Sequence, residues 1–124
     1  MKQKIETEFA PPAIGVYSQA IQDGDLIFVS GQLPIDPSTG QFPSENVSDQ
    51  TEQSLNNLKA ILEAAGYGMD RVVKTTVLLA DIADFGEMNE VYSRFFTVPY
   101  PARSAFQAAG LPKGARVEIE AIAK

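Results

Sequence analysis

The sequence contains no cysteine and no histidine. Without cysteine the chain forms no disulfide, offers no thiol nucleophile and binds no metal through thiolate. Without histidine it lacks the base of Ser-His-Asp and Cys-His catalysis and the commonest ligand of zinc and non-haem iron. Any chemistry must therefore come from carboxylates, arginine, lysine, tyrosine, hydroxyls, amides, the backbone or water.

Further absences concern partners and location. No P-loop, G-x-G-x-x-G or EF-hand spacing is present, which argues against bound nucleotides and metals. Ten basic residues against sixteen acidic ones give a net charge of −6, so the protein repels nucleic acid. No apolar run is long enough to span a membrane. The opening MKQKIETEFA contains no apolar run of the length that a signal peptide needs. We expect a cytoplasmic protein without membrane or nucleic-acid partners.

The length and composition fit one globular unit. The chain has 124 residues, of which 44% are hydrophobic, and domains cluster at about 100 to 150 residues. We therefore expect a single domain over residues 1–124 with a real hydrophobic core.

The first half of the chain predicts two strands and a long helix. Strands are expected at 17–22 and 26–32, because Asp23-Gly24 between two β-prone runs is a strong hairpin signal. A proline-rich loop follows, with turns at Asp36-Pro37 and Thr39-Gly40.

The helix is predicted to start at Ser48 or Asp49. Asp49 and Glu52 have the spacing of a capping box, and Gly66 supplies a left-handed stop. Between them, apolar residues recur at the spacing of one helical face: Leu55, Leu58, Ile61, Leu62 and Ala65.

The second half predicts an interior strand, a second helix and a second hairpin. Residues 71–80, RVVKTTVLLA, carry β-branched and aliphatic side chains at both odd and even positions, as expected of an interior strand covered on both faces. Asp84 and Glu87 are expected to open a helix that ends before Pro99. Its apolar residues are expected to form one stripe: Phe85, Met88, Val91, Tyr92, Phe95 and Phe96. We expect the last two strands, ARSAFQAA and ARVEIEAIA, to pair as a hairpin around GLPKG.

This order of elements predicts an α+β fold, a mixed β-sheet with both helices packed on one face. Two helices cover only one side of such a sheet, yet the interior strand is apolar on both sides. An oligomer that buries the second face is the simplest solution.

Arg103 is the foremost candidate site residue, since it lies in an otherwise small and apolar strand and a guanidinium grips a carboxylate with two hydrogen bonds. The alternative is a structural salt bridge to Glu118 or Glu120. These two glutamates share one strand face, where their repulsion suggests two roles, one pairing with an arginine and one positioning water. Alternatively, both are simply solvated.

Weaker candidates lie elsewhere in the sequence. In Ser30-Gly31-Gln32 the glycine lets a ligand approach the backbone, or else marks a bulge. Tyr17 is either a donor over a cleft or an interface packer. Asn89 lies beside the apolar stripe of the second helix, or is simply exposed.

Five segments resemble the Rid (YjgF/RidA) family of reactive-intermediate deaminases, and the most specific is the last. They are GVYSQAI, FVSGQLPIDPSTG, NLKAILEAAG, VVKTTVLLADIADFGEMNEVYSRFF and YPARSAFQAAGLPKGARVEIEAIA. The resemblance implies a chorismate-mutase-like fold and a homotrimer with a barrel-like core and clefts between subunits. It also implies cofactor-independent hydrolysis of 2-iminopropanoate and 2-iminobutanoate to 2-oxo acids and ammonia, which protects PLP enzymes.

The resemblance also assigns site residues. It implies that Arg103 binds the substrate carboxylate and Glu118 positions the water. The family's other cleft residues fall on Tyr17, Ser30, Gly31 and Asn89. Ala105 stands where many bacterial members have cysteine; since water is the nucleophile, we expect activity to be retained with altered ligand contacts.

Three other functions stay open from the sequence. The first is a trimer that binds carboxylate metabolites without turnover. The second is a ribonuclease, which would need a local basic patch from Lys113, Arg116 and Arg103. The third is a chaperone-like holdase. The sequence also leaves open whether Arg103 and Glu118 meet within one chain or across an interface.

Overall fold

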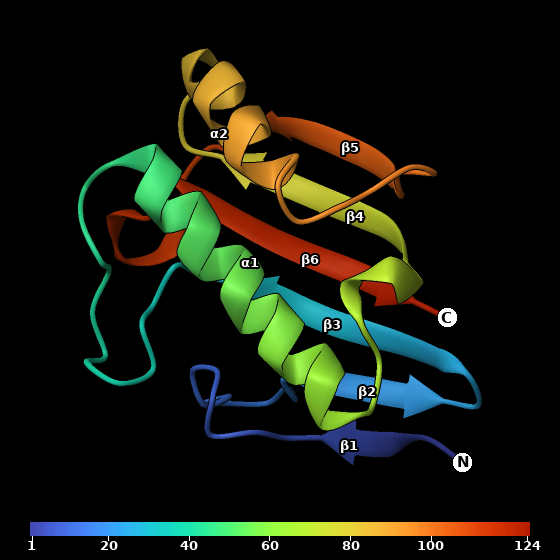
Figure 1. Ribbon diagram of the computed structural model, residues 1–124. Coiled ribbons are helices and arrows are strands. Elements are labelled where there is room, and N and C mark those ends of the chain that lie inside the picture. The colour runs from blue at the N-terminus through green and yellow to red at the C-terminus, as the bar shows by residue number, and fades with distance from the viewer.

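Six strands form one mixed β-sheet in the computed structural model, which describes all of residues 1–124, and two α-helices lie across one face of it (Figure 1). The α+β prediction is confirmed. The elements are β1 (Gln3–Ile5), β2 (Ala20–Asp23), β3 (Leu26–Gln32), α1 (Val47–Ala64), β4 (Val72–Leu79), α2 (Phe85–Tyr92), β5 (Ala102–Gln107) and β6 (Val117–Ala123). The strand order is β1-β2-β3-β6-β4-β5, and only the β4–β5 pair is parallel.

The first hairpin is confirmed, with two differences. Gly24 has a φ of +64° in the turn between β2 and β3, a conformation that favours glycine. However, β2 begins at Ala20 rather than at residue 17. A short strand that was not predicted, β1, pairs with β2 at the sheet edge, and its three residues are too few to give a recognisable alternation.

The long helix begins slightly earlier than predicted, with a different cap. Asn46 is the N-cap, and its Oδ1 accepts hydrogen bonds from the amides of Ser48 (2.8 Å) and Asp49 (3.4 Å). The predicted capping box is therefore wrong; the Asp49 carboxylate instead accepts a hydrogen bond from Ser44 Oγ. The predicted stop is confirmed, since Gly66 has a φ of +80°.

Asp84 stands at the N-cap of α2, but its side chain makes no capping hydrogen bond. Its carboxylate lies 3.4 Å from Arg116 Nε and ties the helix to the start of β6. The helix ends before Pro99, as predicted, and Phe96 beyond its end is still buried.

The predicted hairpin between the last two strands is wrong. β5 pairs in parallel with β4 at the sheet edge, while β6 crosses to the centre and pairs antiparallel with both β3 and β4. The reason lies in the alternation of β6, whose buried residues Val117, Ile119 and Ala121 face the helices. A central position gives this apolar row neighbours on both sides, which an edge position would not.

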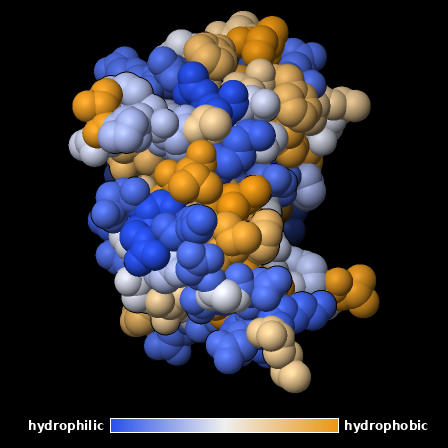
Figure 2. Space-filling model, turned by 90° about the vertical axis from the view of Figure 1, so that its right-hand side faces the viewer, coloured by the Kyte–Doolittle hydropathy of each residue, from blue (hydrophilic) through white to orange (hydrophobic).

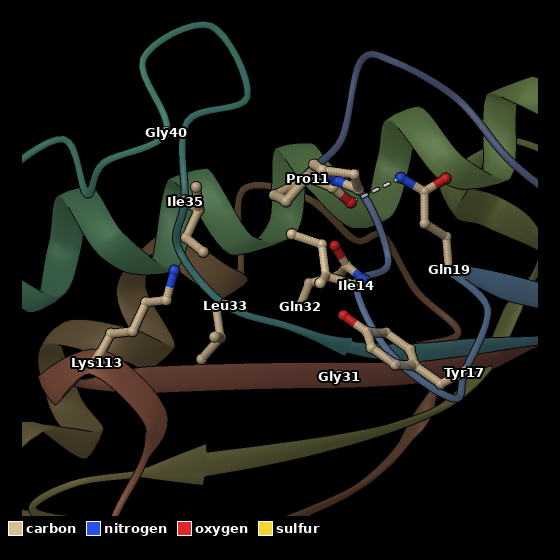
Figure 3. Close-up of a pocket in the computed structure, with 11 residues that line it drawn as sticks. Pro11, Ile14, Tyr17, Gln19, Gly31, Gln32, Leu33, Ile35, Gly40 and Lys113 are labelled. Atoms are coloured by element: carbon tan, nitrogen blue, oxygen red, sulfur yellow. Dashed lines mark hydrogen bonds between the residues drawn. The ribbon is translucent and has the colours of Figure 1, made fainter.

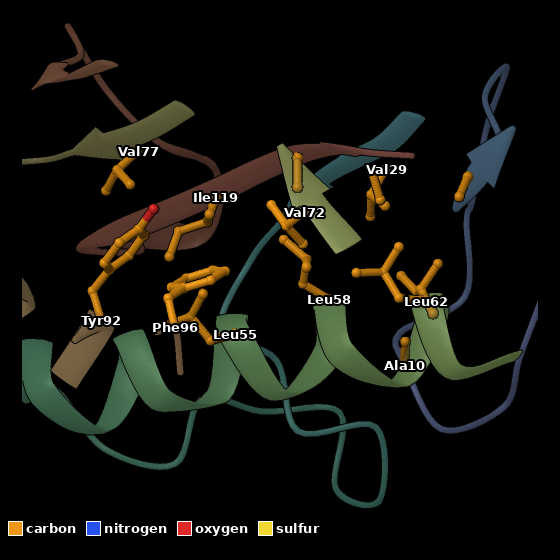
Figure 4. Packing of buried hydrophobic residues seen from close by; sticks show 14 of the residues in the cluster. Ala10, Val29, Leu55, Leu58, Leu62, Val72, Val77, Tyr92, Phe96 and Ile119 are labelled. Atoms are coloured by element: carbon orange, nitrogen blue, oxygen red, sulfur yellow. The ribbon is translucent and has the colours of Figure 1, made fainter. Parts of the chain in front are cut away.

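The hydrophobic core lies between the sheet and the two helices (Figure 4). Leu55, Leu58 and Leu62 of α1 point at the sheet, where Ile119 of β6 and Val72 of β4 lie opposite them, while Val77 of β4 lies near Tyr92. The predicted helical face is thus the buried one.

The opposite face of the sheet is uncovered in the single chain. Phe28 of β3 and Phe106 of β5 both point to this face and are 44% and 49% exposed. Apolar residues also reach the surface between hydrophilic ones on the side seen in Figure 2. An exposed sheet face with large apolar side chains is typical of an interaction surface.

Candidate functional site

Arg103 lies on the helix-covered face of the sheet. It is directly opposite Thr75 in the parallel β4–β5 ladder, and Thr75 is fully buried beneath α2. Paired residues of neighbouring strands point to the same side, so the Arg103 side chain runs toward α2.

Three side chains of α2 surround the guanidinium. Arg103 Nη1 donates a hydrogen bond to Asn89 Oδ1 at 2.7 Å. The guanidinium carbon lies 4.7 Å from the ring centre of Tyr92 and 5.3 Å from that of Phe85. Both distances are within the range of cation–π attraction.

Arg103 has no carboxylate partner. None of the salt bridges of the chain includes it, so the structural ion pair with Glu118 or Glu120 considered from the sequence is not formed. A cavity of about 410 Å³ opens beside the guanidinium, lined by Asn89, Tyr92, Ser93, Tyr100, Pro101 and Arg103. A half-buried cation with unused N–H donors beside a cavity is suited to binding an anion.

Glu118 lies on the other, uncovered face. It pairs with Leu78 of β4, and its neighbours Val117 and Ile119 point to the helices. Burial raises the pKa of Glu118 above its usual value, and repulsion from the Glu120 carboxylate raises this pKa further. A carboxyl group whose pKa lies nearer neutrality is a better general base than an ordinary glutamate.

Gly31 makes room for the Glu118 carboxylate. A Cβ built on Gly31 would overlap Glu118 Oε2 and would lie 3.0 Å from Glu118 Cδ. The β3–β6 register also shifts between Val29 and Gln32, so the bulge considered from the sequence is present as well. Both features follow from the same glycine, which lets the glutamate rest against the β3 backbone.

Tyr17 borders a second cavity on the Gly31 side, with a volume of about 400 Å³ (Figure 3). Tyr17 is 55% exposed and lies in the segment that leads into β2. Gly31, Ile14 and Lys113 line the same cavity. The phenol is thus available to a ligand or a partner chain.

Ser30 holds this segment in place. Its hydroxyl donates a hydrogen bond of 2.6 Å to the carbonyl of Ser18, and its amide donates to the carbonyl of Gln19 at 2.9 Å. These bonds fix the chain next to Tyr17 and use the donor of the Ser30 hydroxyl, whose oxygen can still accept a hydrogen bond.

The structure therefore divides the predicted residues into two groups. Arg103 and Asn89 meet under α2, whereas Glu118 and Gly31 meet at the opposite face. Ala105 is on the Arg103 face and packs against the core, but it does not line the cavity beside Arg103.

Some residues beside Arg103 were not predicted as part of the site. Tyr92 and Phe85 counted only as members of an apolar helical stripe, and Tyr100 was not singled out. Thr75 could have been recognised, because a polar residue in the predicted interior strand is unusual in a core.

The remaining titratable groups form no alternative site. No three acidic side chains converge as a metal site would require. Of the three cations considered from the sequence as a basic patch, Lys113 and Arg116 line one cavity together with Glu45 and Arg103 lines another, and Arg116 is paired with Asp84. Neither helix combines the length and apolar character needed to cross a membrane.

Comparisons with known proteins agree with the fold and the resemblance. The family model described as Endoribonuclease L-PSP matches residues 7–124. RutC family protein y4sK of Sinorhizobium fredii is 58% identical over 122 residues, 98% of this chain and 97% of that protein. The 2-iminobutanoate/2-iminopropanoate deaminase of Rattus norvegicus is 54% identical over 123 residues, 99% of this chain and 90% of that protein.

A solved structure is similarly close. The crystal structure of Escherichia coli TdcF with bound serine has a TM-score of 0.92 and 48% identity, and the match covers 98% of this chain and 97% of that one. With a family match over nearly its whole length and relatives more than 50% identical, this chain belongs to the Rid (YjgF/RidA) family, whose matching model is described as Endoribonuclease L-PSP.

Proposed function

We propose that this protein hydrolyses reactive 2-imino acids, such as 2-iminopropanoate and 2-iminobutanoate, to 2-oxo acids and ammonia, and so protects PLP enzymes. The observation that carries the proposal is the unpaired Arg103 guanidinium beside its cavity. The rat relative named as a deaminase of these two compounds, 54% identical over almost the whole chain, gives the reaction.

The proposal includes a homotrimer in which the uncovered sheet faces form a barrel-like core. Two observations support an assembly. Phe28 and Phe106 expose apolar surface on this face, and burying such surface drives association. Arg103 and Glu118 lie on opposite faces of one sheet, so they cannot meet within one chain. A site that uses both therefore combines Arg103 of one subunit with Glu118 of the partner subunit.

In the proposed mechanism, Arg103 binds the substrate carboxylate through two parallel hydrogen bonds and fixes C2 next to a water molecule. The water oxygen attacks C2 of the protonated imine as Glu118 of the partner subunit accepts a water proton, which gives a neutral carbinolamine. The glutamic acid then donates this proton to the nitrogen. The C–N bond breaks and ammonia leaves as the glutamate carboxylate takes the hydroxyl proton and the C2 carbonyl forms, and this proton passes to the solvent. General acid–base catalysis of this kind contributes about 10² to 10⁴ in rate. These steps require no cofactor.

A coupled assay tests the activity. An amino-acid oxidase generates 2-iminobutanoate from 2-aminobutanoate, catalase removes the peroxide, and semicarbazide traps the imine that survives. We expect this protein to lower the trapped yield and raise the rate of 2-oxobutanoate formation. A trapped yield equal to that with an inert protein contradicts the proposal.

One observation favours a second candidate, a trimer that binds small carboxylate ligands without turnover. The related TdcF structure contains bound serine, which has a carboxylate but no C=N bond. The Glu118→Gln variant separates the two functions. For an enzyme we expect 2-oxobutanoate affinity within about threefold of wild type and a kcat lower by about 10² or more. A protein that only binds shows no turnover before or after the change.

The domain boundaries and the cellular location of the protein are part of the same proposal. We propose that residues 1–124 act as one domain, because the core links the first strand to the last. The cytoplasmic location inferred from the sequence stays a prediction.

A further inference from the structure

We propose that Tyr92 is a positioning residue for Arg103: its ring face holds the guanidinium so that the unused N–H groups face the cavity. This inference rests on the proposed function, since it concerns how the site binds its carboxylate. It gives a role to a residue that the sequence pattern assigned to the core alone.

The Tyr92 ring is placed as a platform. Its centre is 4.7 Å from the guanidinium carbon of Arg103, and the residue is only 5% exposed. In Figure 4 the side chain rises from α2 toward the sheet, with Phe96 beside it. The two ring centres are 4.6 Å apart, so both rings belong to the same part of the core.

A buried hydrogen bond fixes the far end of the ring. The Tyr92 hydroxyl is 2.7 Å from Thr75 Oγ1, and Thr75 lies opposite Arg103 in the strand ladder. The ring is therefore attached to α2 through its backbone and to β4 through its hydroxyl. Thr75 is also the ladder partner of Arg103. The Tyr92 ring and the Arg103 side chain are therefore both positioned relative to the same residue of β4.

A buried polar pair in an otherwise apolar core requires a reason. Thr75 is fully buried among residues such as Val77 and Leu79, where an apolar side chain would avoid the cost of burying a hydroxyl. The Thr75–Tyr92 bond contributes little net stability. It does determine where the ring lies, and hence where a ring-bound cation lies.

Tyr92 also leaves the positive charge of Arg103 available. Burial raises the pKa of the Tyr92 hydroxyl, against the smaller opposing effects of the Thr75 hydrogen bond and the Arg103 charge. The neighbouring phenol therefore stays neutral at physiological pH. Asn89 is neutral too and takes one N–H. Arg103 is held by groups that do not neutralise it, and the substrate carboxylate can act as its counter-ion.

The test compares Tyr92→Met, Tyr92→Phe and the control Phe96→Leu. Tyr92→Met fills much of the volume without a ring, whereas Tyr92→Phe keeps the ring and loses the hydroxyl. Phe96→Leu disturbs the same part of the core without a contact to Arg103. For each protein, KM and kcat for 2-iminobutanoate, the Kd of 2-oxobutanoate by calorimetry and the melting temperature are measured.

We expect Tyr92→Met to raise KM and Kd together by about 5- to 30-fold, with kcat changed less than threefold. Tyr92→Phe keeps the ring but loses the hydrogen bond that places it, so its Kd should rise by about 2- to 5-fold, less than in Tyr92→Met. Phe96→Leu should lower the melting temperature but leave Kd unchanged. Equal Kd values for Tyr92→Met and wild type overturn the inference, as does an equal loss of affinity in Phe96→Leu.

If the Tyr92→Met protein does not fold or assemble, an NMR measurement on the wild-type protein tests the inference instead. In labelled protein, the Arg103 Nε–H proton signal should be shifted upfield by the ring current of Tyr92, and a signal at the position of an exposed arginine overturns the inference. The calorimetric and spectroscopic results do not need turnover. If the protein has no deaminase activity, they still decide the role of Tyr92, and only the proposed reaction fails.

Discussion

The two faces of the sheet hold their functional side chains in different ways. On the helix-covered face, Arg103 is held by the amide of Asn89 and the rings of Tyr92 and Phe85, all from its own chain. On the uncovered face, Glu118 rests against the Gly31 backbone and meets the repulsion of a second carboxylate. The cationic half of the proposed site is thus enclosed by groups of its own chain, whereas the anionic half lies on the uncovered face of the sheet.

This difference indicates how a small fold without histidine or cysteine can perform chemistry. The proposed anion anchor needs a fixed geometry, and a packed helix provides it. The proposed water-positioning group needs partial desolvation to adjust its pKa, and the burial of Glu118 against the Gly31 backbone already raises this pKa within the single chain. The following predictions test each half.

The largest effect is expected from removing the anchor. Arg103→Ala should lower kcat/KM for 2-iminobutanoate by about 10² to 10⁴, since two charge-assisted hydrogen bonds of about 1.5 to 3 kcal/mol each are lost. The coupled assay measures this rate. Arg94→Ala, at an exposed residue paired only with Glu90, is the matched control. An Arg103→Ala protein that hydrolyses imines at the wild-type rate contradicts the role of this half.

A smaller effect is expected from filling the space beside Glu118. In Gly31→Ala the new Cβ must displace the Glu118 carboxylate, which is the flexible end of a side chain, so the fold can adapt. We expect kcat to fall about 10- to 100-fold, with the melting temperature little changed. Gly110→Ala, where a Cβ meets nothing within 4 Å, controls for the extra methyl group. Unchanged kcat in Gly31→Ala would show that the Glu118 position does not matter.

The smallest effect is expected from the neighbouring charge. Activity should fall at low pH as the Glu118 carboxylate is protonated, with a midpoint above the ordinary value of 4.5. Desolvation is the larger cause of the raised pKa and Glu120 the smaller, so Glu120→Gln should move this midpoint down only part of the way. A pH–rate profile of kcat measures the shift, and Glu63→Gln on the exposed side of α1 should leave it unchanged. An upward shift in Glu120→Gln would refute the assignment.

The same group links stability to pH. Because the folded state raises the pKa of Glu118, it binds this proton more tightly than the unfolded chain does. The stabilisation is complete below the unfolded value near 4.5 and is lost as the pH rises through the folded pKa. Lowering the pH across this window therefore increases the contribution of Glu118 to the free energy of unfolding, while it lowers the activity.

Local features of the fold could be predicted from the sequence. The Asp23-Gly24 hairpin and the Gly66 stop were found because the residues that determine each turn are adjacent. The position of β6 could not be found in this way, since it depends on which strands flank it after the chain has folded. A short Gly-bounded loop predicts a hairpin, but the apolar face of β6 is better satisfied between β3 and β4.

For the candidate site, too, the sequence indicates single residues but not how the fold arranges them. Arg103 was identified because a charged residue in an apolar strand pattern is visible in the sequence, whereas only the family resemblance distinguished Glu118 from Glu120. The placement of Arg103 and Glu118 on opposite faces depends on the parallel pairing of β4 with β5, which the hairpin prediction missed. The role of Tyr92 was hidden for another reason: helical periodicity shows that a ring is buried but not what its face contacts.

Mixing two inactive variants tests most directly whether the site is shared between subunits. Arg103→Ala and Glu118→Gln chains are unfolded together, refolded at equal amounts and assayed for imine hydrolysis. If each site takes Arg103 from one chain and Glu118 from the next, random assembly restores about a quarter of the sites to the native pair, and activity should recover to that extent. If both residues of a site came from one chain, no mixture would contain a native site, and a refolded mixture as inactive as either parent would contradict the account.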